Sequence, residues 1–190
     1  MRLNKFWHFC VALLLALSLG NAVHAADAIE IKEARIELGE DGYRLASSFE
    51  FELNHGLEDA VSRGVPLYFT TEVELTRPRW YWFDEKTLRA SLTQRLSYNV
   101  LTRKYTVAIP DGMHRSVNTL DEALFLVRRP NRWVIAGRGS FKPGEVYTVT
   151  MRMGLNLEFM SKPFQVNAIN NSDWRLSSDR KSFSFKADDK

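Results

Sequence analysis

The chain of 190 residues carries 26 basic and 23 acidic side chains, a formal net charge of +3, and one cysteine, Cys10. So small a net charge gives no argument for an anionic partner, and we expect no contact with nucleic acid. One cysteine excludes a disulfide framework, so the chain must hold itself together with a hydrophobic core, which this length can supply. We expect a single domain and a monomer.

The N-terminal segment has the three-part layout of a secretory signal. A basic start is followed by a mainly apolar stretch from Phe6 to Leu19 and by small residues that end at Ala25. We expect cleavage after Ala25, which makes residues 1–25 a signal peptide and places the mature chain in the periplasm without a transmembrane span. An uncleaved anchor is the alternative, but fourteen residues interrupted by His8 fall short of the roughly 17 to 25 that span a bilayer.

Cleavage changes the chemistry of the chain. It removes Arg2, Lys5 and Cys10 and no acidic residue, so the mature chain of 165 residues has a net charge of +1 and no thiol. The high isoelectric point of the precursor therefore says nothing about the partners of the mature protein.

Two strands and a short helix are predicted before residue 64. Between residues 28 and 38 the apolar positions change phase near Lys32, which is typical of a strand with a β-bulge. The turn at 39–42 leads into an alternating segment over 43–53, so we expect an antiparallel hairpin. A short helix is predicted over 57–63, ending at a glycine that can serve as its C-terminal cap.

The central strand is predicted over residues 65–75. Its apolar side chains recur at every second position, which is the period of a half-buried strand. Pro78 has no N–H for the hydrogen-bond ladder, so the strand must be at an edge, bulged or finished there.

Three further elements are predicted before Pro130. Alternation from Leu88 to Val100 and again over 105–109 predicts two neighbouring strands, with Gln94 as the one polar residue that faces inward. Residues 119–122, TLDE, have the layout of a capping box, so a helix of about two to three turns is expected after them.

The C-terminal part is predicted to hold a strand at 133–135, a type II turn at 142–145, a return strand at 147–157 that forms a hairpin with the first, and a last strand over 164–168. We predict that residues 177–190 form a polar, frayed tail.

These elements predict an all-β fold, mainly antiparallel. Seven to nine strands with one or two short helices favour a two-layer β-sandwich over residues 26–176, with an immunoglobulin-like strand order as one variant. The residues expected in its core are Leu67, Phe69, Val73, Leu92, Leu96, Val149, Met151 and Leu155.

The titratable residues do not form a catalytic or metal-binding motif. The mature chain has two histidines, His55 and His114, too few and too far apart in sequence for a metal motif, so we assign no catalytic residue, metal or cofactor. A site assembled from distant loops is the alternative. In that case His55 or His114 would lie beside Asp111 or Asp173, and the protein would be a periplasmic hydrolase.

The densest cluster of aromatic and cationic residues is TRPRWYWFDEK, residues 76–86. Tryptophan beside arginine can stack on a protein or a glycan. We therefore take Arg77, Arg79, Trp80 and Trp82 as candidate partner-binding residues, with an envelope protein as the first partner and a glycan as the second. The alternative is a structural role, which is more frequent for such stacking than a binding role. In that case every second aromatic side chain belongs to the core, and the arginines lie across the outer faces of these rings.

Four segments are similar to one known family. GVPLYFTTEVELTRPRWYWFDEK, RLSYNVLTRKY, TLDEAL and KPFQVNAINNSDW occur in this order and resemble the exported proteobacterial proteins catalogued as domain of unknown function 4390. The resemblance spans nearly the whole mature chain and implies no catalytic residue. It implies an accessory role in the cell envelope, linked to a membrane sensor kinase of the nitrogen-regulation type. We therefore expect an exported, non-catalytic binding or accessory module.

Overall fold

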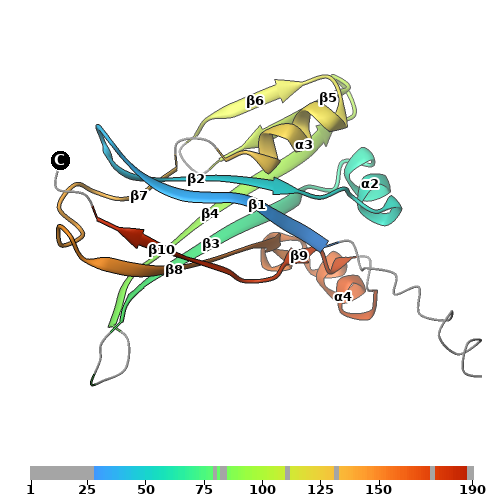
Figure 1. Ribbon diagram of the computed structural model, residues 1–190. Coiled ribbons are helices and arrows are strands. Elements are labelled where there is room, and N and C mark those ends of the chain that lie inside the picture. Colours follow the sequence, from blue (N-terminus) through green and yellow to red (C-terminus); the bar gives the residue numbers. More distant parts are fainter. Residues whose placement is uncertain are drawn as a thin grey trace, which may run out of the picture.

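The computed structural model describes residues 28–78, 81, 85–109, 112–130, 133–171 and 174–187, so the predicted signal peptide lies outside the described residues. The described chain is mostly β with short helices, which confirms the all-β prediction (Figure 1). Its elements are β1 (Ala28–Gly39), β2 (Gly42–Glu50), α2 (His55–Ser62), β3 (Leu67–Arg77), β4 (Glu85–Asn99), β5 (Lys104–Ala108), β6 (His114–Val117), α3 (Leu120–Arg128), β7 (Trp133–Ala136), β8 (Val146–Leu155), η1 (Leu157–Phe159), α4 (Lys162–Asn170), β9 (Ser177–Ser178) and β10 (Lys181–Lys186).

The ten described strands form one sheet that curls into a half-barrel (Figure 1). Their order is β6-β5-β4-β3-β8-β9-β1-β2-β7, and β10 also pairs with β8. The sheet is mixed because β1 and β9 are parallel, whereas the other pairs are antiparallel. We call the two sides of this curled sheet its arms: the first arm holds β6, β5, β4, β3, β8 and β10, and the second holds β1, β2 and β7.

The first hairpin forms as predicted. The register between β1 and β2 shifts between Ile31 and Glu33, which is the expected bulge, and the turn joins Gly39 to Gly42. Gly42 has a φ of 132°, and a Cβ at this position would lie 2.3 Å from the carbonyl oxygen of Ala136. Only glycine fits here, because both the backbone angle and the contact with β7 exclude a side chain.

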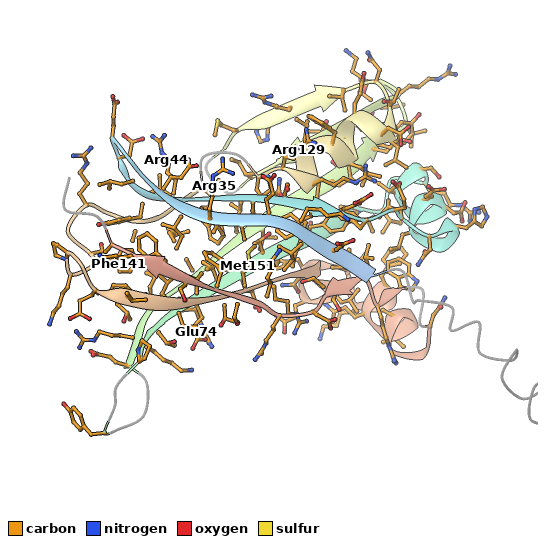
Figure 2. The ribbon with its side chains drawn as sticks, viewed as in Figure 1. Arg35, Arg44, Glu74, Arg129, Phe141 and Met151 are labelled. Atoms are coloured by element: carbon orange, nitrogen blue, oxygen red, sulfur yellow. The ribbon has the colours of Figure 1, made fainter. Side chains whose placement is uncertain are left out.

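The hydrophobic core lies between the two arms. Tyr43 of β2 meets the rings of Phe141 and Phe185 with centroids 4.7 and 5.8 Å apart, in edge-to-face geometry. Figure 2 shows Phe141 and Met151 between the arms, with Glu74 on the outer side of the sheet. Seven of the eight residues predicted for the core are buried, and the eighth, at the end of β8, is half-buried.

Both predicted helices are confirmed. The side chain of Asn54 accepts a hydrogen bond from the backbone N–H of Leu57 at the start of α2. The start of α3 has the complete capping box, with Thr119 accepting from the N–H of Glu122 and Glu122 accepting from the N–H of Thr119. Each cap satisfies N–H groups that have no partner inside the helix.

Two predictions for the C-terminal part are wrong. Residues 164–168 belong to the helix α4, because Pro163 fits the first helical turn and a three-residue alternation is too short to fix a strand. Phe164 and Ala168 are shielded on one side of α4, whereas Val166 is exposed. The predicted hairpin between 133–135 and 147–157 does not form either, because β7 pairs with β2 and β8 pairs with β3 and β10.

The segment predicted to fray contains β9 and β10. Six residue pairs join β10 to β8, from Lys181 opposite Met151 to Lys186 opposite Val146. Phe185 is 8% exposed, so alternation of phenylalanine with serine in this strand directs apolar side chains to the core. Polarity of the segment as a whole concealed this pattern.

Candidate partner-binding hairpin

The stem of the β3–β4 hairpin is closed by an ion pair. Arg77 and Glu85 are opposite each other in the register, and the guanidinium of Arg77 donates to the carboxylate of Glu85. This hydrogen bond and the negative charge raise the pKa of Arg77. Only 22% of the Arg77 side chain is exposed. Arg77 therefore closes the stem of the hairpin, and most of its side chain is covered.

The other predicted binding residues follow this stem. Tyr81 is 65% exposed, whereas Arg79, Trp80 and Trp82 lie outside the described residues. The paired ends of β3 and β4 extend past β8 and β10 in Figure 1, so the connection between them begins away from the body of the sheet. We define residues 78–84 as the hairpin loop.

A charged groove runs over the outer face of the sheet, next to this hairpin. It has a volume of about 530 Å³ and is lined by residues of β3, β4 and β8 that include Glu72, Glu74, Arg89 and Arg152. Glu74 accepts from Arg89 at 2.8 Å and lies 3.2 Å from the ammonium of Lys86. Both hydrogen bonds lower the pKa of Glu74, and the one from Arg89 has the larger effect. The groove holds a network of ion pairs across strands, which stabilises the sheet.

Of the residues predicted for a hydrolase site, the two histidines lie in the described part of the chain. His55 is exposed at the start of α2, and His114 begins β6, opposite Ala108 of β5. Asp111 and Asp173 lie outside the described residues. Among the described residues no three histidine, cysteine, aspartate or glutamate side chains are placed to hold a metal ion.

One exposed feature was missed by the sequence analysis. Val100 was counted among the core-facing residues of its strand, but it is 61% exposed and the next residue, Leu101, is 95% exposed. Both lie in the four-residue connection between β4 and β5. The signal in the sequence was two adjacent apolar residues, because neighbours in a strand cannot both face the core.

The fold and these surfaces define a β-rich domain, one curled sheet with exposed side chains at its two ends, Tyr81 at one and Leu101 at the other. A family model described as a domain of unknown function, DUF4390, matches residues 26–184, so the chain belongs to this family and the resemblance is confirmed. No curated protein and no solved structure matches the chain. The described helices are all too short or too polar to cross a membrane.

Proposed function

We propose that the protein is an exported, non-catalytic binding or accessory module of the bacterial cell envelope. Its signal peptide ends at Ala25, and its partner in the periplasm is a protein, with a glycan as the second candidate. The membrane sensor kinase implied by the family resemblance is the first protein partner to look for.

The β3–β4 hairpin carries this proposal. Its stem is paired as far as Arg77 and Glu85, and the one described residue in the middle of its loop, Tyr81, is 65% exposed. An exposed aromatic side chain on a firmly held stem is typical of a recognition loop, because a rigid scaffold lowers the entropy lost on binding. The sequence adds Trp80 and Trp82 on either side of Tyr81, and tryptophan is enriched among residues that dominate binding energy.

Site-specific photocrosslinking in the native cell tests the proposal. A photoreactive amino acid replaces Tyr81 in the full chain, and a matched probe replaces Glu40 in the exposed turn between β1 and β2. We expect a discrete crosslinked protein from position 81 and none from position 40. Mass spectrometry identifies that protein, and it also shows whether residues 1–25 have been removed.

A double substitution separates binding from folding. Trp80→Ala with Trp82→Ala should abolish the crosslink and leave the thermal unfolding midpoint nearly unchanged, because loop residues of a binding surface contribute little to the core. If the double variant unfolds, at the cost of about 3 to 5 kcal/mol typical of a buried aromatic, the two tryptophans are core residues and the proposal fails. An unchanged crosslink in a folded double variant would also contradict it.

A further inference from the structure

The register of the strands gathers several connections at one end of the sheet. Ala28, the first residue of β1, lies opposite Ser177, which lies opposite Gly154 near the end of β8. Leu67 at the start of β3 pairs with Leu96 near the end of β4. We call this the Leu101 end, and it contains the β4–β5 connection, η1, α4 and the start of β1, on the right in Figure 1. The hairpin loop 78–84 is at the opposite end.

The β4–β5 connection holds two aliphatic side chains in solvent by a defined local structure. The side-chain oxygen of Asn99 accepts hydrogen bonds from the backbone N–H groups of Leu101 and Thr102, at 2.9 and 3.1 Å. Arg103 closes the connection with a φ of 53°, the described chain's one non-glycine residue in the left-handed region. An asparagine turn of this kind fixes the loop conformation. The exposure of Val100 and Leu101 is therefore built into the fold.

Other apolar side chains are exposed at the same end. Phe159 of η1 is 56% exposed and Val166 of α4 is 60% exposed. Between η1 and the start of β3 lies a groove of about 330 Å³, lined by aromatic and aliphatic side chains that include Pro66, Tyr68 and Phe164. Hydrophobic side chains gathered on one end of a domain indicate a contact surface, whereas single ones need no explanation.

Two cationic residues follow the exposed aliphatic pair in the chain. Arg103 and Lys104 are both exposed, and neither forms an ion pair within the described part of the chain. An apolar tip followed by cations fits an anionic lipid bilayer, because the aliphatic groups enter the acyl region while guanidinium and ammonium groups contact phosphates.

We propose that the Leu101 end is a membrane-docking surface. Val100 and Leu101 insert into the interface of an anionic bilayer, and Arg103 and Lys104 bind lipid phosphates. Phe159 and Val166 give a second apolar contact. This surface is separate from the hairpin loop 78–84, so it does not depend on the proposed function.

A fluorescent probe at the tip tests the proposal in the full chain. An environment-sensitive nitrobenzoxadiazole probe is attached to Leu101→Cys in a Cys10→Ser background, and Glu40→Cys carries the matched control probe at the opposite end of the sheet. Vesicles of phosphatidylethanolamine and phosphatidylglycerol carry a doxyl quencher in their acyl chains. Emission from position 101 should shift to the blue and be quenched, and emission from position 40 should not change. If the chain binds the vesicles but the probe at position 101 keeps the emission spectrum it has in water, the proposal is wrong.

Substitutions beside the probe show which chemistry is responsible. Val100→Asp should lower quenching at position 101 by about tenfold or more, since a charge enters the interface poorly. Thr102→Asp is the control for added charge, and it should have a smaller effect because residue 102 lies beside the tip. Replacing phosphatidylglycerol by phosphatidylcholine should weaken docking of the parent, and Arg103→Glu should remove this lipid dependence. If a photoreactive group at position 101 captures a protein in cells while lipid quenching is absent, the surface binds protein and the lipid proposal is wrong.

Discussion

Neighbouring threonines of β3 point to opposite faces of the sheet and differ in hydrogen bonding. The hydroxyl of Thr70, on the outer face, lies 2.9 Å from that of Thr93 and 3.2 Å from the amide nitrogen of Asn156. Thr71, on the inner face, is fully buried, and its hydroxyl has no hydrogen-bond partner among the described residues. A buried hydroxyl without a partner loses its hydration and gains nothing in return.

Replacing each threonine by valine should therefore have opposite effects. Thr71→Val removes the unsatisfied hydroxyl and should stabilise the protein by up to about 1 kcal/mol, whereas Thr70→Val breaks two hydrogen bonds and should destabilise it by about 1 kcal/mol. Denaturant unfolding of the two variants beside the parent measures both effects. Destabilisation by Thr71→Val would show that its hydroxyl has a partner in solution.

The carboxylate of Glu74 links β3 to β4 and should make stability depend on pH. Its pKa is lowered in the folded state by Arg89 and Lys86, so its contribution is complete above the unfolded pKa and is lost as the pH falls through the folded pKa. Glu74→Gln should lower the free energy of unfolding at neutral pH by at most about 1 kcal/mol, which denaturant unfolding measures. The difference from the parent should vanish in acid. Glu40→Gln, which removes no ion pair of the described chain, should show little effect at either pH.

At the scale of elements, β10 contributes an aromatic side chain that packs between the two arms of the sheet. Phe185 of β10 contacts Tyr43, Phe141 and Tyr147, with ring centroids 4.7 to 6.4 Å apart within this aromatic group. Tyr43 belongs to the second arm of the sheet, and Tyr147 to the first. One side chain near the C-terminus therefore joins the two arms.

Phe185→Ala should cost about 3 to 5 kcal/mol, because it leaves a cavity between aromatic rings that cannot close around it. Ser184→Ala, on the exposed side of the same strand, is the control and should change stability by less than about 0.5 kcal/mol. Thermal unfolding followed by near-ultraviolet circular dichroism reports the loss of aromatic packing. Equal stability of the two variants would mean that residues 177–190 fray in solution, as their composition suggests.

The sequence predicted the elements whose signals are local. The bulge near Lys32, the capping box at Thr119 and the alternation of β3 each depend on a few adjacent residues, and each is confirmed. Strand partners depend on contacts between distant segments, which no local pattern encodes. For that reason β7 was assigned to β8, although its backbone pairs with β2.

Of the candidate binding residues, Arg77 lies in the part of the chain that the structure describes. Arg77 was assigned to recognition from its aromatic neighbours, but its ion-pair partner, Glu85, lies eight residues further along the chain, in the strand that returns. Exposure of Val100 and Leu101 was missed because the alternation of β4 was extended by one residue into a turn. Side-chain direction reverses with each position of a strand, so an error of one residue at the end of a strand exchanges core and surface.

At the scale of the whole molecule, the two proposed surfaces are separated by the length of β4. Its fifteen residues join the hairpin loop 78–84 to the β4–β5 connection, a distance of about 50 Å at the rise of an extended strand. When the Leu101 end lies on a bilayer, the hairpin loop is held away from it by the long dimension of the sheet. A partner of the loop must therefore extend well above the lipid surface.

The two surfaces should fail independently. Val100→Asp should prevent quenching at the Leu101 end and leave the crosslink from position 81 intact in a chain released from the membrane. Trp80→Ala with Trp82→Ala should have the converse effect. Sites so far apart are expected to have additive effects, so the triple variant should lose both activities and keep the unfolding midpoint of the double variant. Loss of both activities from Val100→Asp would instead indicate that the partner and the membrane share one surface.

The parallel pairing of β1 with β9 fixes the order in which the protein can finish folding. Ala28 and Ile29 find their partners only at Ser177 and Ser178, so nearly the entire chain must emerge before the second arm of the sheet is joined to the first. A contact between residues so far apart forms late, because the entropy of closing the loop between them is lost before the contact stabilises anything. If the chain is exported from its N-terminus, as we propose, it thus stays open, and accessible to chaperones and proteases, until its last strands have passed.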